Sequence, residues 1–170
     1  MAFFRHISIY PIDNKVDRLS TYVQGTHFRD ALSAKISLPD MTPAELQHAI
    51  FAYMPQWVTK LMWLRNRIVQ LLGVELQGEG MAPKNSELAV GDSAGFLVVK
   101  EKYCDEIISF AEDKHMTFYL SVAKRQQLVV ISTLVNQKTL FGKLYVAAIR
   151  PFHYVVARAV ISSAVKGKRI

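Results

Sequence analysis

Hydrophobic and polar positions along the chain change their period three times. Residues 28–38 alternate weakly between apolar and polar side chains and end at a Pro-Asp turn, which is typical of a strand. A short apolar stretch at residues 5–10 precedes this strand, and residues 16–23 are long enough for one short helix. The chain therefore begins with extended segments and short turns.

A helical period follows between residues 42 and 73. Thr42, Pro43 and Glu45 predict a helix start, because threonine caps backbone amides, proline suits the first helical position and glutamate completes a capping box. Pro55 interrupts this helix, since proline lacks the donor that a helix interior needs. Beyond it, apolar residues recur at steps of three and four and predict an amphipathic helix that ends near Gly73, with a buried seam of Trp57, Leu61, Leu64, Ile68 and Leu71.

The period changes to that of strands after a loop-like segment at residues 74–94. Short β-rich runs occupy residues 96–103, 106–111, 116–123 and 128–135, and turn-type residues separate them. Such short connections predict antiparallel pairing, because parallel strands need long crossovers.

From Leu140 the helical period returns and continues to the basic residues 166–170, which we expect to form a frayed tail. Pro151 is expected to kink this helix. Apolar side chains gather on one face and predict the side that is buried: Leu144, Tyr145, Ala148, Phe152, Val155, Val156 and Ala159.

This order of elements predicts an α+β fold in a single domain over residues 1–170. The strands follow one another instead of alternating with helices, which excludes repeated βαβ units. A curved antiparallel sheet gripping the long C-terminal helix is the simplest arrangement that buries both apolar faces. Such a sheet can enclose an apolar cavity between itself and the helix.

Composition narrows the class of protein. With 51% hydrophobic residues among 170, the chain holds enough apolar material for one core, and eight glycines and six prolines exclude collagen-like or low-complexity chains. The single cysteine, Cys104, excludes an internal disulfide framework and fits a reducing compartment. The N-terminus lacks a signal-peptide pattern, so we expect a cytoplasmic protein.

The net charge of +7 is spread along the chain. Three basic residues lie in the last five positions and the others are scattered, so we interpret them as a solvated surface and do not expect nucleic acid as a partner. The apolar segment 144–165 contains Arg150, Pro151, His153 and Arg158. It is therefore not expected to span a membrane.

Residues 91–95 match the Gly-x-Ser-x-Gly pattern of a nucleophile elbow. An elbow places its serine on a sharp turn between a strand and a helix. A strand follows Ser93 here, so a glycine-bearing turn is the simpler interpretation. No catalytic residue is assigned from this motif.

Two histidines are candidates for acid–base chemistry. His115 follows Asp113 in a turn, where the carboxylate either orients the imidazole for proton transfer or stabilises the turn. His153 lies between the two faces of the C-terminal helix, where it either points into the cavity or is hydrogen-bonded at its boundary. A metal site would require these histidines to converge with a third ligand, and Asp113-x-His115 alone is no metal motif. We therefore expect neither a metal site nor a cofactor.

Aromatic residues at helix and strand spacings either form plain core or line the expected cavity. Phe118 shares a strand face with other apolar residues and is expected to point inward, whereas His115 lies on the opposite face. The expected ligand-binding residues combine apolar walls with a few polar contacts: Trp57, Leu61, Phe118, Thr133, Asn136, Tyr145, Phe152 and His153.

Three stretches together resemble a bacterial protein family. They are Pro55-x-Trp57-Val58 with residues 61–66, then Gly91-Asp92, Gly95-Phe96 and Glu101 followed by Asp113-Lys114-His115-x-x-Phe118, and finally Gly142-x-Leu144-Tyr145 with Pro151-Phe152-His153. In these residues the chain is similar to domain-of-unknown-function family 2867, over roughly residues 28–165. That family is similar to the START-like helix-grip superfamily, which includes polyketide cyclases. The resemblance implies a helix-grip fold and a cavity for an apolar or aromatic molecule, and it transfers no catalytic residue.

Three functions follow from these observations. The first is a non-catalytic module that binds an apolar or aromatic small molecule in the cavity. The second is a polyketide-cyclase-like enzyme in which His115 or His153 serves as acid or base. The third is an interaction domain that docks on a separate NAD(P)-dependent reductase, because the resemblance associates this domain with a reductase-like one.

Overall fold

The computed structural model describes residues 6–13, 15, 17–71 and 80–170. The elements follow the predicted order of strand, helices, strand meander and long helix. They are β1 (Ile7–Ile9), η1 (Arg18–Tyr22), β2 (His27–Lys35), α1 (Pro43–Phe51), α2 (Gln56–Leu71), β3 (Ser93–Ala94), β4 (Leu97–Lys102), β5 (Glu106–Glu112), β6 (Met116–Arg125), β7 (Leu128–Gln137) and α3 (Leu140–Lys166). The expected end of the second helix near Gly73 lies outside the described residues.

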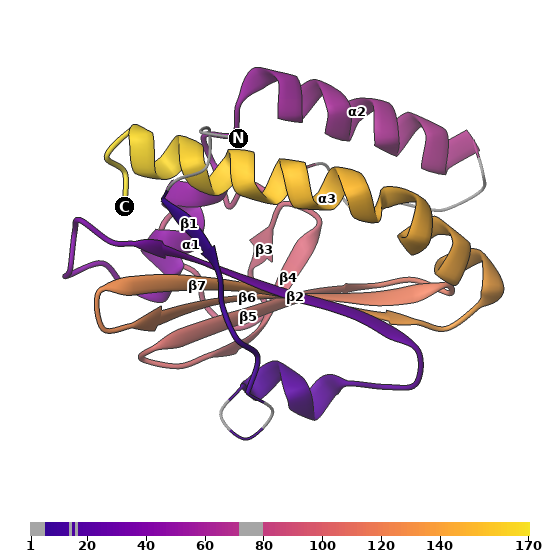
Figure 1. Cartoon of the computed structure of the whole chain (residues 1–170), viewed down its shortest axis with the longest axis horizontal. Coiled ribbons are helices and arrows are strands. Elements are labelled where there is room, and N and C mark those ends of the chain that lie inside the picture. The colour runs from indigo at the N-terminus through magenta and orange to yellow at the C-terminus, as the bar shows by residue number, and fades with distance from the viewer. Residues whose placement is uncertain (1–5, 14, 16, 72–79) are drawn as a thin grey trace.

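All seven strands form one antiparallel sheet in the order β1-β2-β7-β6-β5-β4-β3. Strands β4 to β7 are the predicted meander, and β2 from the N-terminal half pairs with β7 along nine residues. The sheet is curved, and α3 lies across one of its faces (Figure 1). The predicted α+β fold, with a curved antiparallel sheet holding a C-terminal helix, is confirmed.

The start of α1 confirms the predicted capping box. The Thr42 hydroxyl accepts from the Glu45 amide at 3.3 Å, and the Glu45 carboxylate accepts from the Thr42 amide at 2.7 Å. These hydrogen bonds to Thr42, led by the one from its amide, hold the pKa of Glu45 below its usual range. Pro43 occupies the first helical position, where it costs no hydrogen bond.

The main core lies between the sheet and the helices α1 and α3. Because side chains alternate along a strand, Leu32, Val122 and Ile131 point to this face and meet Ile50 of α1 and Ile161 of α3. A smaller core lies on the opposite face, where η1 covers the sheet, and it consists of Leu19, Ile108, Tyr119 and Leu134. Both faces of the sheet are therefore partly covered.

The predicted buried seam of α2 is wrong. Val58 and Val69 are buried, whereas Trp57, Leu64 and Ile68 of the predicted seam are about half exposed. The reason is the position of α2, which lies on α3 and away from the sheet (Figure 1). Only a narrow strip of α2 is covered, where Val58 and Met62 reach the main core and Arg65 contacts Tyr145 of α3.

The predicted core-facing side of α3 is wrong for three of its large residues. Leu144, Phe152 and Val155 are more than half exposed. The buried positions are instead Gly142, Val146, Val160, Ile161, Ser162 and Ala164. Sheet and helix meet along these positions, so the large apolar side chains of Leu144, Phe152 and Val155 are left outside.

The chain after α3 is packed against the protein, so the expected frayed tail is wrong. Arg169 donates to the carbonyl oxygens of Ala49 and Tyr53 at 3.1 and 3.3 Å. The side chain of Ile170 is buried in the main core. By length and composition alone α3 meets the conditions for a membrane-crossing helix, with a mean hydropathy of 1.3, but helices packed on a sheet meet the same conditions.

Candidate ligand-binding site

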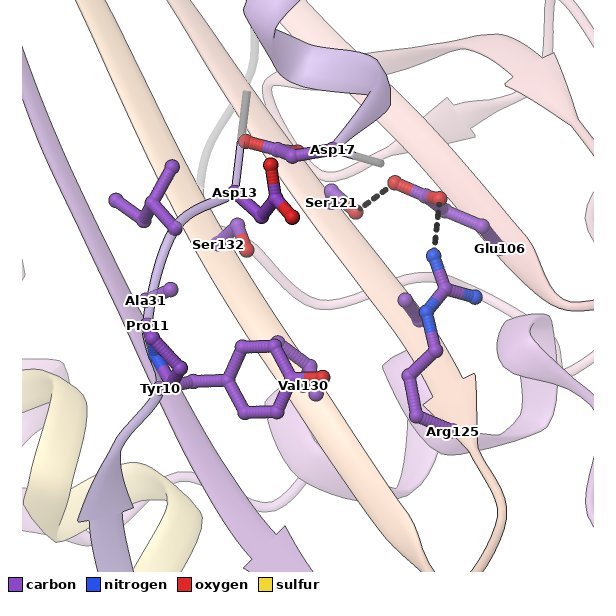
Figure 2. Close-up of a pocket in the computed structure, with 12 residues that line it drawn as sticks. Tyr10, Pro11, Asp13, Asp17, Ala31, Glu106, Ser121, Arg125, Val130 and Ser132 are labelled. Atoms are coloured by element: carbon purple, nitrogen blue, oxygen red, sulfur yellow. Dashed lines mark hydrogen bonds and ion pairs between the residues drawn. The ribbon is translucent and has the colours of Figure 1, made fainter. Parts of the chain in front are cut away.

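A hollow of about 370 Å³ lies on the face of the sheet opposite α3 (Figure 2). Its floor consists of two cross-strand rows, Glu106–Ala123–Val130 and Ser121–Ser132–Ala31. Because alternate residues point to opposite faces, these rows lie behind the strand positions that build the main core. Most of these floor side chains are alanine or serine, which leaves space that larger residues would fill.

The chain before η1 forms the other side of the hollow. The Tyr10 amide donates to the Ala31 carbonyl at 2.9 Å and brings residues 10–13 over the sheet. Asp17 caps η1 by accepting from the Leu19 amide at 3.1 Å, and it forms an ion pair with Arg29 of β2. This N-terminal segment is therefore tied to β2 at both of its ends.

A buried carboxylate occupies one end of the hollow. Glu106 is 2% exposed and accepts from the Ser121 hydroxyl at 2.6 Å. It also accepts from Arg18 Nη1 at 2.6 Å and from Arg125 Nη2 at 3.0 Å. Asp105 accepts from Arg125 Nη1 at 2.6 Å. Such pairing offsets the cost of burying the charge of Glu106.

The same contacts set the protonation of the neighbouring groups. The hydrogen bond to Glu106 raises the pKa of Arg18 above its usual range. Burial opposes ionisation of Asp105, but the hydrogen bond and the charge of Arg18 outweigh it and hold the pKa of that carboxyl below its usual range. Arg18 and Asp105 are therefore charged at neutral pH.

The ten predicted site residues, all of which the structure describes, do not line this hollow. Phe118 and Thr133 lie on the helix-facing side of the sheet, where Phe118 packs against the main core. Asn136 lies on the opposite face, where its amide donates to the Tyr22 carbonyl at 2.7 Å and accepts from the Gln24 amide at 3.0 Å. Asn136 thus anchors the chain between η1 and β2.

The predicted residues of α2 and α3 do not form one wall. Tyr145 packs against the buried cluster of Phe28, Val135 and Val146, between α3 and the sheet. Trp57 is 49% exposed and Phe152 is 61% exposed, and Leu61 is partly buried. The Tyr145 hydroxyl accepts from Arg65 Nε at 2.5 Å, so this residue joins α3 to α2. The residues that the sequence predicted to line one cavity therefore lie on several separate surfaces.

Asp113 and His115 organise the turn between β5 and β6. The Asp113 carboxylate accepts from the backbone amides of His115 and Met116 at 2.6 and 2.8 Å. The His115 ring does not contact that carboxylate and is hydrogen-bonded through Nδ1 to Thr139 Oγ1 at 2.9 Å. Of the two predicted roles, the contacts match turn stabilisation.

His153 lies at the boundary between α3 and β2. Its Nε2 is 3.0 Å from Asp30 Oδ2, and its ring meets Phe28 edge-on. These contacts match the hydrogen-bonded boundary histidine of the sequence analysis. Within the described chain, His, Cys, Asp and Glu side chains form no group of three that could hold a metal ion.

The Gly-x-Ser-x-Gly stretch is a turn and not a nucleophile elbow. Ser93 lies in β3, its hydroxyl donates to the Gly95 carbonyl at 2.9 Å, and β4 follows instead of a helix. Gly95 has a φ of +68°, and a Cβ there would lie 2.3 Å from the Gly80 carbonyl oxygen. That oxygen is held by the Phe96 amide at 2.9 Å, so the position requires glycine.

Replacing Gly95 with alanine should lower the free energy of unfolding by about 2–3 kcal/mol, because left-handed backbone strain and a clash with fixed backbone add. Gly91→Ala is the matched control, since its φ is +91° but no atom lies within 4 Å of a Cβ there. It should cost about 1 kcal/mol. Urea unfolding of both variants measures the difference, and equal losses would contradict the close contact at Gly95.

One sequence signal for the hollow was available. Small residues recur at every second position on the two strands that flank β7, as Ala31 and Ser33 in β2, and Ser121 and Ala123 in β6. The large apolar residues on the other face of the sheet predicted the gripped helix, so the expected ligand site was assigned to that face. Residues 10–13 and Asp17, which line the other side of the hollow, carry no sequence pattern that predicts their position over the sheet.

Comparison with known proteins identifies the family. No curated protein and no solved structure matches the chain. The model of a family described as a protein of unknown function, DUF2867, matches residues 22–160. This range includes the strand residues that form the floor of the hollow. It begins after residues 10–13 and Asp17, which line the other side of the hollow. The chain therefore belongs to the DUF2867 family.

Proposed function

We propose that this member of DUF2867 is a small-molecule-binding protein of the START-like helix-grip type. Its ligand occupies the hollow between the N-terminal segment and the sheet. The curved antiparallel sheet and the C-terminal helix support the fold assignment. The observation that carries the binding proposal is the hollow itself, with the paired, buried Glu106 at one end.

The lining favours a compact molecule with one apolar or aromatic part. The volume of the hollow, about 370 Å³, falls within the range of ligand pockets, which is roughly 300–1,000 Å³. The ring of Tyr10 stands on one side together with Ala31 and Val130, and Glu106 and Arg125 stand on the other (Figure 2). A bound molecule would place its apolar part against Tyr10 and its polar group toward Glu106.

The charges of the lining favour a hydrogen-bond donor as that polar group. Asp13, Asp17 and Glu106 contribute three carboxylates, and Arg125 contributes one guanidinium. An anionic ligand would meet more like charge than opposite charge, whereas an N–H or O–H donor finds acceptors. We propose binding without turnover, because the two histidines considered for acid–base chemistry are engaged away from the hollow.

Indole tests this proposal as a compact aromatic probe with one donor. Native mass spectrometry of the freshly purified full chain should show a bound molecule. Adding indole to ¹⁵N-labelled protein should shift the amide signals of Tyr10, Ser121 and Ser132. Ala123→Phe should weaken indole binding at least ~10-fold by filling the floor.

Ala148→Phe is the matched control. Ala148 is exposed on α3, on the far side of the sheet from the hollow, and the substitution adds the same side chain. Binding that survives Ala123→Phe, or signal shifts confined to α2 and α3, would refute the hollow as the ligand site. Absence of both a co-purified molecule and any indole shift would refute the binding function.

A further inference from the structure

The helix α2 is an outer element of the fold. It lies on the side of α3 away from the sheet (Figure 1). Arg65 holds it to α3 through Tyr145, and Val58 and Val69 are its buried positions. Much of the remaining surface of α2, and the part of α3 that neither α2 nor the sheet covers, are open to solvent.

These two helices expose much apolar surface. Of the fifteen large hydrophobic residues that are exposed in the described chain, eight belong to α2 and α3. We call them the outer apolar set: Trp57, Trp63, Leu64, Ile68, Leu140, Leu144, Phe152 and Val155. Within the most apolar window of α3, only 22% is buried. A surface of this kind usually marks an interaction site.

All charged side chains of the same two helices are basic. The sequence of α2 contains three Lys or Arg residues, that of α3 contains four, and neither helix contains Asp or Glu. Lys60, Arg67, Lys143 and Arg150 are exposed. The fourteen acidic residues of the chain all belong to other segments. The seven basic residues of the two helices therefore equal the net charge of +7, because the other segments hold fourteen basic and fourteen acidic residues.

Charge decides between the candidate occupants of this surface. A second copy of the chain would bring two surfaces of the same sign together, which opposes association. An anionic lipid surface offers opposite charge at its headgroups and apolar depth beneath them. Trp, Leu and Phe enter that boundary while Lys and Arg stay at the headgroups. The Arg67 guanidinium lies 5.7 Å from the centre of the Trp63 ring, which places both groups at one level.

We infer that α2 and α3 bind flat on an anionic membrane surface, through the outer apolar set and the basic residues beside it. This inference does not rest on the proposed ligand. The hollow lies on the opposite face of the sheet from α3, so a protein bound in this way keeps its N-terminal segment in water. Ligand binding and membrane binding can therefore fail separately.

Intrinsic fluorescence reports directly on this surface, because the two tryptophans of the chain are Trp57 and Trp63. The full chain is mixed with phosphatidylcholine vesicles, with or without about 30% phosphatidylserine. With phosphatidylserine present, tryptophan emission should shift to the blue and the protein should sediment with the vesicles. Binding should be at least ~10-fold weaker to phosphatidylcholine alone, or when NaCl rises from about 0.1 to about 0.5 M.

Two double charge reversals distinguish the charge of this surface from the net charge of the whole chain. Lys60→Glu with Arg67→Glu should abolish the shift, whereas Lys35→Glu with Lys102→Glu changes the net charge equally on exposed strand positions and should retain binding. Leu64→Ser with Ile68→Ser should weaken binding at least ~10-fold through lost insertion. The inference is overturned if phosphatidylserine vesicles cause no shift, if both charge pairs lose binding equally, or if the chain is a dimer that already shields its tryptophans.

Discussion

Replacing Ile161 with alanine is expected to lower the free energy of unfolding by about 3 kcal/mol. Ile161 is 1% exposed and packs between α3 and the sheet, so truncation leaves a cavity that the surrounding core fills only in part. Urea unfolding followed by far-UV circular dichroism measures this loss. The slope of the transition should not change, because the folded state keeps the same compactness.

Phe152→Ala is the informative comparison for Ile161→Ala. The sequence pattern places Phe152 on the buried face of the helix, but the residue is 61% exposed in the fold. Its truncation should change the free energy of unfolding by no more than about 0.5 kcal/mol. A cost similar to that of Ile161→Ala would mean that something covers this side of α3 in solution, and a self-associated chain would then have to be considered first.

Removing the carboxylate of Glu106 is expected to have a comparable effect. Glu106→Ala should lower the free energy of unfolding by about 3 kcal/mol, because the Ser121 hydroxyl, Arg18 and Arg125 all lose their shared partner. Glu106→Gln should cost less, since its amide oxygen still accepts one or two of these hydrogen bonds. Hydrogen exchange should also show faster opening of η1, which Arg18 attaches to the sheet.

An exposed ion pair of similar geometry serves as the control for Glu106. Glu112 pairs with Lys138, but their side chains are 54% and 33% exposed, so Glu112→Ala should cost less than about 1 kcal/mol. The two variants remove the same charge from the same strand, β5, which leaves burial as the main difference. Equal effects would show that the network at Glu106 contributes no more than a surface pair.

The two faces of the sheet have different roles in this protein. The helix-facing side is filled by the main core and provides the stability that Ile161→Ala tests. The other side carries the smaller core, the charged network and the hollow. The proposed ligand and the proposed membrane surface thus lie on opposite sides of one rigid sheet. A ligand bound in the hollow would not need to alter the helices.

Local patterns in the sequence were sufficient for the elements and their order. The capping box at Thr42, the turns between β4 and β7 and the restart of the helix after Pro55 depend on residues within a few positions of one another. Backbone geometry and hydrogen bonding act over that range, so the residues alone predict them. The α+β class followed because short connections allow only antiparallel pairing.

Tertiary structure alone decided which apolar side of each long helix is covered and where the hollow lies. An apolar stripe such as Trp57, Leu64 and Ile68 shows that a helix side prefers to leave water, but the neighbour that covers it is set by packing between distant segments. Arg18 and Glu106 likewise meet only because η1 folds over the sheet, and the two residues are 88 positions apart in the chain. The sequence therefore determined the elements and their periods, whereas the contacts between distant elements determined the site.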